Sequence, residues 1–207
     1  MDFSSKDYNG IFFKIIRLLN IRLNSFISSM FCISVARLKK VNVGHHTKFN
    51  GITIFYRKPS TKIEIGNNCQ FISNFNTNLV GVNRQCIVAT HSDFARIQIG
   101  NGCGFSGTVI GAAESIIIGN NVFFGANTLV TDFDWHAVDP EHRKTGKPKS
   151  APIVIEDNVW VGINVVVLKG VTIGQNSIIG ANSLVVKDIP ANVIAGGNPC
   201  QVIKPIE

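Results

Sequence analysis

The stretch IVIEDNVWVGINVVVLKGVTIGQNSIIGANSLV, residues 153–185, decides the fold of this chain. A large apolar residue recurs in it at every sixth position: Ile155, Val161, Val167, Ile173, Ile179 and Val185. An α-helix repeats about every 3.6 residues and a plain strand about every 2, so a period of six fits neither. It is typical of a parallel β-helix, in which each coil has three short flat faces and each face points one large residue inward.

The composition agrees with a single stacked unit. The chain has 207 residues, of which 45% are hydrophobic and only 16% charged. Such a balance suits a solenoid whose polar atoms are mostly backbone groups paired between coils. The net charge of +7 indicates an anionic ligand, such as one that carries phosphate. There is no long Lys/Arg run and no nucleic-acid motif, so a nucleic-acid partner is not predicted.

The five cysteines do not indicate a disulfide framework or a zinc site. Their number is odd and no C-x-x-C occurs. Cys69 and Cys103 each stand four residues after an isoleucine of the repeat, at Ile65 and Ile99. Val or Ser fills this position elsewhere in the repeat, so we expect both cysteines to be small core residues in a reducing cytosol.

Residues 1–40 are predicted to form a separate amphipathic helical segment. The longest stretch without a charge, Leu23 to Ala36, has 14 residues, which is short of the roughly 20 that a membrane-spanning helix needs. Two interpretations remain open. The segment either caps the open end of the β-helix, or it rests weakly on a membrane surface through its basic and apolar residues. The second would place a cytoplasmic protein at the inner face of the membrane.

The β-helix itself is predicted over residues 41–190, with two interruptions. Residues 72–96 break the phase of the repeat and are expected to form a turn or a small excursion. Residues 132–152 form a protruding loop, and long loops on a regular scaffold are usually functional. Pro190 is expected to end the stack, and residues 191–207 to form a tail that ends in a strand.

Several motifs resemble the hexapeptide-repeat acyltransferases. They are residues 153–162 (IVIEDNVWVG), 170–174 (GVTIG), 186–190 (VKDIP) and the tail 197–204 (GNPCQVIK). The branch that they resemble most is that of the galactoside/maltose acetyltransferases and polysaccharide O-acetyltransferases. The resemblance covers about residues 97–204. It implies an all-β, left-handed parallel β-helix, a homotrimer with active sites between neighbouring subunits, acetyl-CoA as co-substrate, and no metal.

The resemblance also implies the catalytic residue. The catalytic histidine of the family lies in the protruding loop, seven residues before an arginine, and His136 and Arg143 have this spacing. A sugar hydroxyl is a poor nucleophile near neutral pH, so a base must take its proton as it attacks the thioester. Histidine suits this role because its ordinary pKa lies near the working pH. Asp132 and Asp134 are candidates to orient the imidazole, although loop solubility explains them equally well.

The donor and acceptor sites follow from the same resemblance. Family precedent assigns CoA contacts to Trp160, Gly162, Ile163, Ala181, Val186, Lys187 and Lys204. Gln201 stands where relatives carry an arginine, so one CoA contact of the family is missing. Phe105 and Ala113 stand where galactoside-type relatives carry the asparagine and aspartate that bind the acceptor. We therefore expect a sugar hydroxyl of surface polysaccharide biosynthesis (capsule or O-antigen) rather than a small glycoside.

Three other functions remain open. The chain could acetylate the hydroxyl of a xenobiotic such as an antibiotic, or the amine of an amino sugar. A different class, the γ-type carbonic anhydrases, shares the β-helix and binds zinc through three histidines, for which His91, His136 and His142 are the candidates. The sequence does not identify the acceptor or the residues that bind it.

Overall fold

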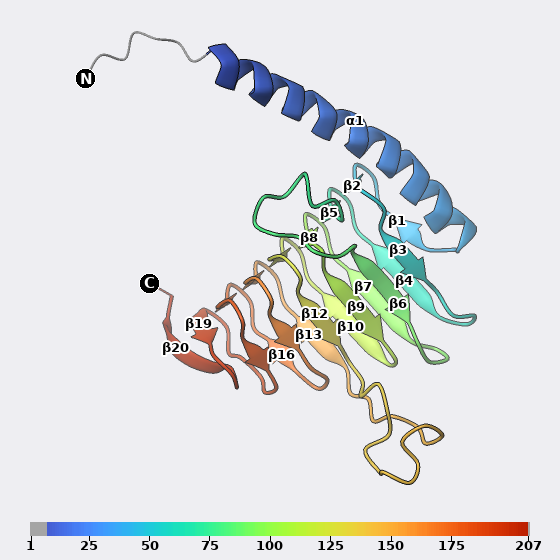
Figure 1. Cartoon of the computed structure of the whole chain (residues 1–207). Helices are drawn as coiled ribbons and strands as arrows, with labels where there is room; N and C mark the ends of the chain where they lie inside the picture. Colours follow the sequence, from blue (N-terminus) through green and yellow to red (C-terminus); the bar gives the residue numbers. More distant parts are fainter. Residues whose placement is uncertain (1–7, 207) are drawn as a thin grey trace.

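The computed structural model describes residues 8–206; the first seven residues of the expected N-terminal segment and residue 207 lie outside the described part. The chain begins with a single helix, α1 (Tyr8–Leu38), which lies across the first end of a stack of strands (Figure 1). By length and composition alone, its residues Asn9–Leu38 are apolar enough to cross a membrane.

The strands form three sheets, named A, B and C. Sheet A contains β1 (Asn42–Val43), β4 (Lys62–Ile65), β7 (Arg96–Ile99), β10 (Ser115–Ile118), β13 (Ile153–Ile155) and β16 (Thr172–Ile173). Sheet B contains β2 (Lys48–Asn50), β5 (Gln70–Ile72), β8 (Gly104–Ser106), β11 (Phe123–Phe124), β14 (Trp160–Val161), β17 (Ile178–Ile179), β19 (Val193–Gly196) and β20 (Gln201–Pro205). Sheet C contains β3 (Ile54–Tyr56), β6 (Ile87–Thr90), β9 (Val109–Ala112), β12 (Leu129–Thr131), β15 (Val166–Val167) and β18 (Leu184–Val185).

The chain visits sheets A, B and C in turn, so that β1 to β18 make six coils of three strands each. Each strand pairs in parallel with the strand three places further along the chain, as β14 does with β11 and β17. The predicted left-handed parallel β-helix is confirmed. Because the coils pair through their backbones, the stack needs few charged groups to satisfy its polar atoms.

The residues at every sixth position point into the prism, as the period predicts, and the longer strands of sheet A bury a second residue two positions earlier, such as Ile153 in β13. Ile155, Val161, Val167 and Ile173 are each 0% exposed. In the earlier coils the inward position of sheet B is aromatic: Phe49, Phe71, Phe105 and Phe124 stack in this order with ring centroids 5.1, 4.5 and 5.1 Å apart. Cys69 and Cys103 are buried in the same core, as expected.

The corners between the sheets depend on asparagine and glycine. Asn158, Asn164, Asn176 and Asn182 have φ values of 59°, 55°, 61° and 57°, in the left-handed region that asparagine tolerates better than other side chains do. The amide of Asn158 donates to the Oδ1 of Asn176 at 3.1 Å, and that of Asn164 donates to Asn182 at 3.2 Å. We name the corners by the sheets they join; in the fifth coil the B/C corner is residues 162–165 and the C/A corner residues 168–171.

The structure narrows the first interruption and extends the end of the stack. The predicted excursion over 72–96 is confined to residues 73–86, because β6 returns to sheet C with Val88 inward. The stack does not end at Pro190 as expected: Ile189 bridges Ile173 of sheet A, and β19 pairs in parallel with β17. The tail then turns back as β20, antiparallel to β19.

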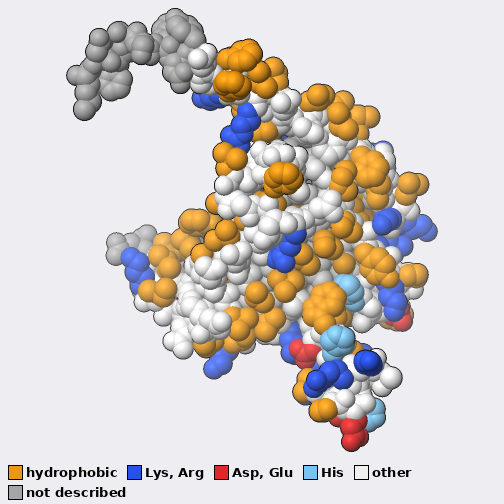
Figure 2. Space-filling view, viewed as in Figure 1, with side chains coloured by type: hydrophobic (Ala, Val, Ile, Leu, Met, Phe, Trp, Pro, Cys, Tyr) orange, Lys and Arg blue, Asp and Glu red, His pale blue; other side chains and the backbone are white. Residues whose placement is uncertain are grey.

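The second interruption is the protruding loop that the sequence predicts. Residues 132–152 connect β12 of sheet C to β13 of sheet A and stand out from the stack (Figures 1 and 2). Figure 2 shows charged and histidine side chains gathered on this loop, whereas the neighbouring faces of the stack show few.

Candidate active site

The protruding loop is fixed at its base, where it leaves the C/A corner of the fourth coil. Phe133 and Ser150 form an antiparallel bridge. The Asp134 amide donates to the Lys149 carbonyl at 2.9 Å, and the Ala151 amide donates to the Asp132 carbonyl at 2.9 Å. The two ends of the loop are therefore held together, and the residues between them project from one defined place on the stack.

The two aspartates at this base hold the loop and do not contact His136. The carboxylate of Asp132 is buried and accepts the backbone N–H groups of Ala113 at 2.6 Å and Glu114 at 2.9 Å. Burial raises the pKa of Asp132, and the two N–H donors act in the opposite direction. Asp134 pairs with Lys169 at 2.5 Å. The expectation that either carboxylate orients the imidazole is not met.

His136 is exposed, and within residues 8–206 no hydrogen bond or ion pair engages its ring. The other loop histidine differs, because the Nδ1 of His142 lies 2.6 Å from a carboxylate oxygen of Asp139. Arg143 makes a long hydrogen bond, from Nη2 to the Val138 carbonyl at 3.5 Å. The His136 imidazole is thus available to a group that approaches from outside the chain.

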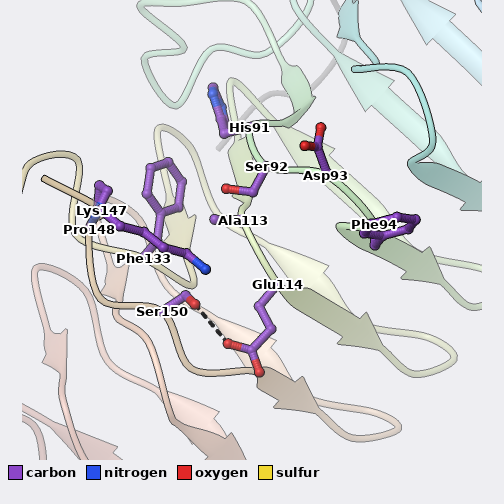
Figure 3. Close-up of a pocket in the computed structure, with 10 residues that line it drawn as sticks. All are labelled: His91, Ser92, Asp93, Phe94, Ala113, Glu114, Phe133, Lys147, Pro148 and Ser150. Atoms are coloured by element: carbon purple, nitrogen blue, oxygen red, sulfur yellow. Dashed lines mark hydrogen bonds between the residues drawn. The ribbon is translucent and has the colours of Figure 1, made fainter. Parts of the chain in front are cut away.

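A cavity of about 390 Å³ opens at the base of the loop (Figure 3). Its lining comes from two C/A corners and the two arms of the loop: His91, Ser92, Asp93, Phe94, Ala113, Glu114, Phe133, Lys147, Pro148 and Ser150. Glu114 crosses its floor to accept the Ser150 hydroxyl at 2.8 Å. The cavity therefore offers both apolar surface and hydrogen-bonding groups, which is the usual character of a small-molecule site.

An aromatic cluster borders this cavity. The ring of His91 lies 5.2 Å from that of Phe133 and 4.8 Å from that of Trp135, centroid to centroid. Burial lowers the pKa of His91, so its imidazole is neutral at pH 7. No sequence motif surrounds His91, and the strand register of sheet C shows that it occupies the C/A corner two coils before the loop.

Three of the residues predicted to bind CoA lie together at the B/C corner. The Gly162 amide donates to the Ile179 carbonyl at 2.8 Å, and the Ile163 carbonyl accepts from Asn182, next to Ala181, at 2.9 Å. A Cβ at Gly162 would lie 2.7 Å from the Ala181 nitrogen. The backbone of the next coil therefore requires glycine at 162, whether or not a ligand approaches there.

The other predicted CoA residues lie elsewhere on the surface. Trp160 points outward from sheet B, in register with Phe123 and Ile178, and is 56% exposed. Lys204 is exposed on β20, opposite Ile194. Val186 and Lys187 are exposed where the chain leaves β18 at the C/A corner. His136 and Lys187 thus share one edge of sheet C, and Gly162, Ile163 and Ala181 occupy the other.

The outer face of sheet C, between these two edges, is apolar from end to end. One outward row runs through all six strands in register: Ile54, Ile87, Val109, Leu129, Val166 and Leu184. The equivalent row on sheet A contains Asn42, Glu64, Gln98, Ile117, Val154 and Thr172. Aliphatic residues therefore face outward along the whole of sheet C but only along part of sheet A.

Replacement of Asp132 should weaken the base of the loop. Asp132→Ala removes a buried carboxylate that accepts two backbone N–H groups, which costs about 1–3 kcal/mol of the free energy of unfolding. Asp134→Ala is the matched control, because it removes only a partly exposed ion pair, worth about 0–1 kcal/mol. Thermal denaturation at one protein concentration measures both. Equal effects of the two changes would contradict this role of Asp132.

Within the described residues 8–206, no group of three His, Cys, Asp or Glu side chains is placed to hold a metal ion. His91 packs against Phe133 and Trp135, and His142 pairs with Asp139, so these two histidines do not converge with His136 in one chain.

Comparison with known proteins identifies relatives of this arrangement. Residues 152–187 match the family described as bacterial transferase hexapeptide (six repeats), and residues 115–130 match the hexapeptide repeat of succinyl-transferase. The galactoside O-acetyltransferase of Lactococcus lactis is 41% identical over 145 residues, which are 69% of this chain and 63% of that protein. That of Escherichia coli is 50% identical over 92 residues, 44% of this chain and 45% of that protein. The chain thus spans less than two thirds of the length of either relative.

Solved structures share the fold. A hexapeptide-repeat acetyltransferase from Vibrio cholerae superposes with a TM-score of 0.57 at 24% identity, over 99% of this chain and 95% of that one. An N-acyltransferase from Bacillus cereus superposes with a TM-score of 0.64 at 20% identity, over 83% of this chain and 87% of that one. At these identities the likeness is one of architecture.

Proposed function

The chain belongs to the hexapeptide-repeat family that includes the galactoside O-acetyltransferases, and we propose that it is itself an acetyl-CoA-dependent O-acetyltransferase acting on a sugar hydroxyl. The observation that carries this proposal is the position of His136. Its imidazole is exposed and has no partner in the described part of the chain, and the two arms of the loop that carries it line a cavity of about 390 Å³ through Phe133, Lys147, Pro148 and Ser150. A free imidazole on a loop whose base lines a small-molecule cavity is suited to act as a general base.

In the proposed reaction, His136 takes the proton of the acceptor hydroxyl as its oxygen attacks the thioester carbonyl of acetyl-CoA. The C–O bond forms, the C–S bond breaks, and the CoA thiolate leaves. The proton held on the imidazole then passes to the thiolate, which regenerates the base. The chain supplies position and proton transfer, and no metal takes part in this scheme.

We propose that the active site lies between copies of the chain in a homotrimer. The support is the division of the predicted residues between the two edges of sheet C, with an apolar row between them. A cyclic trimer with sheet C toward its axis brings the C/A edge of one copy against the B/C edge of the next. His136 and Lys187 of one copy then meet Gly162, Ile163 and Ala181 of its neighbour along one seam.

The acceptor is proposed to be a sugar in surface polysaccharide biosynthesis, modified in the cytoplasm where acetyl-CoA is available. The rings of His91, Phe133 and Trp135 give flat apolar surface for a pyranose, and Ser92, Asp93 and Glu114 give groups that bind hydroxyls. Ala113 contributes only a methyl group to the cavity. An acceptor wider than a small galactoside fits the absence of a larger side chain at that position.

Thiol release from acetyl-CoA, measured over a panel of candidate acceptors, tests this function. The panel contains galactosides, nucleotide-linked sugars, amino sugars and hydroxyl-bearing antibiotics. Turnover with a sugar hydroxyl, unaffected by a chelator, is the expected result. Turnover confined to an amino sugar or to an antibiotic would replace the acceptor that we propose, and zinc-dependent CO₂ hydration without thiol release would overturn the reaction itself.

Charge reversal at the predicted donor site should affect acetyl-CoA selectively. Lys187→Glu together with Lys204→Glu places negative charge where the phosphates of CoA are expected, so the KM for acetyl-CoA should rise by about tenfold or more. The acceptor KM should change much less, because the cavity at the loop base contains neither residue. Lys48→Glu, on sheet B at the far end of the stack, is the control. An equal rise in both KM values would mean that the donor lies elsewhere.

A further inference from the structure

The two halves of α1 have different surroundings. In the C-terminal half, Ser28, Cys32 and Ala36 are buried against the first coil. The hydroxyl of Ser28 accepts the Gly51 amide at 3.1 Å, and that of Ser29 accepts the Phe49 amide at 2.9 Å. This half therefore caps the stack, and its orientation is fixed by hydrogen bonds to the first coil.

The N-terminal half of α1 extends beyond the stack and has little cover (Figure 1). Its large apolar side chains are mostly exposed: Ile11, Phe12, Phe13, Ile15, Ile16, Leu18, Leu19, Leu23, Phe26 and Ile27. These positions cover most of the helix circumference, and the remaining side carries Lys14, Arg17 and Asn24. An apolar helix surface this wide is normally covered by protein or lipid, whereas most of these side chains are exposed.

The excursion over residues 73–86 adds to this exposed surface. Phe75, Leu79 and Val80 are 69%, 76% and 59% exposed. Phe75 and Leu79 face Phe13 and Ile16 of α1 across a cavity of about 610 Å³. We call the exposed apolar residues of 11–27, together with Phe75, Leu79 and Val80, the N-terminal apolar surface. Figure 2 shows hydrophobic side chains gathered over this end of the molecule.

This end of the molecule is also strongly cationic. Residues 8–63 contain ten Lys and Arg and no Asp or Glu. Within the described residues, Lys14, Arg17 and Arg22 make no ion pair. A second copy of this surface would bring like charges together, so self-association through it is disfavoured. An apolar surface ringed by unpaired cations is instead complementary to a layer of acyl chains beneath anionic headgroups.

We propose that the N-terminal apolar surface docks the protein on an anionic lipid bilayer, with the N-terminal half of α1 lying in the interfacial plane. The helix does not cross the bilayer, because Lys14, Arg17 and Arg22 fall within its apolar stretch and charges at the bilayer centre are costly. In the plane, their long side chains reach the headgroups while the stems stay among apolar groups. The acetyl-transfer site is then held near the membrane, independently of which sugar it modifies.

Sedimentation of the full chain with lipid vesicles tests this docking. The chain should bind vesicles of phosphatidylglycerol and phosphatidylethanolamine at least about tenfold more tightly than vesicles of phosphatidylcholine, and high salt should weaken that binding. Lys14→Glu with Arg17→Glu should remove most of the preference for anionic vesicles. Binding that is equal on neutral and anionic vesicles would contradict the role of the cations.

Two leucines of the same helix provide a matched pair. Leu19→Glu places a charge in the N-terminal apolar surface and should weaken vesicle binding by about tenfold or more. Leu38→Glu, at the last residue of α1, makes the same change outside it and should leave binding unaltered.

No vesicle binding by the unaltered chain would overturn the proposal. Light scattering provides a second test. If Leu19→Glu, but not Leu38→Glu, formed a smaller oligomer than the unaltered chain, the N-terminal apolar surface would be a contact between copies, and the proposal would be overturned. Thiol release with a soluble acceptor should stay normal in both variants, so failure of docking is distinguishable from failure of the proposed reaction.

Discussion

His136→Ala should lower kcat by about 10²–10⁴-fold while the assembly and the thermal stability stay unchanged, because the loss of a general base typically costs this much. The side chain is exposed and unpaired within the described residues, so its removal opens no cavity in the core and leaves no partner without a hydrogen bond. The comparison is made by thiol release from acetyl-CoA with the best acceptor of the panel.

His142→Ala is the control for this experiment. It removes a second exposed histidine from the same loop. The imidazole of this histidine is paired with the Asp139 carboxylate, whereas that of His136 has no partner within the described residues. Its turnover should stay within about twofold of the unaltered chain. A folded His136→Ala variant with near-normal turnover would contradict the assignment of His136 as the base. Equal losses of turnover in the two variants would indicate that any change in the loop lowers activity, and would contradict it as well.

Val166→Glu should abolish both trimer formation and activity. Val166 is the fifth of the six residues in the outward apolar row of sheet C, between Leu129 and Leu184. A carboxylate there would be buried without a partner on assembly, and three copies of it would approach one another around the axis. Analytical ultracentrifugation measures the assembly, and thiol release measures the activity of the same sample.

Val154→Glu is the matched control, because Val154 points outward from sheet A in the same coil. Both changes place a carboxylate on a half-buried strand position, so any loss of stability within the chain is similar. Only the sheet C variant should dissociate. A Val166→Glu protein that remains trimeric would show that another face of the prism forms the interface.

The fold was largely predictable because the β-helix repeats a local rule. Each sixth residue must fill the same interior position, so the spacing alone predicts that Ile155 and Val161 are buried, and they are. The repeat predicts a wider excursion than the structure has, for the same reason. The insertion at 73–86 shifts the six-residue phase of the repeat, so Val88 is no longer a multiple of six residues from Ile65 although it is buried. The continuation past Pro190 was missed because Pro190 lies at a corner, where a missing N–H costs no strand pairing.

The candidate site was less predictable, because its parts meet through stacking rather than through sequence proximity. The loop and His136 were visible as a break in the period. His91 was not, since it reaches the loop only through the alignment of consecutive C/A corners. Asp132 and Asp134 are candidates to orient His136 only by nearness along the chain, whereas the stack offers Asp132 two backbone donors and Asp134 a lysine.

The central claim is that each active site combines His136 of one copy with the B/C corner of the next. It is tested most directly by mixing two variants, His136→Ala and Ala181→Trp, each of which should be inactive alone. Ala181 is exposed, so the indole should block the donor without disturbing the core. Random co-assembly leaves about one quarter of the seams with both halves intact, and the mixed trimers should recover about that fraction of the unaltered activity. Mixed trimers that stay inactive would contradict a site shared between copies.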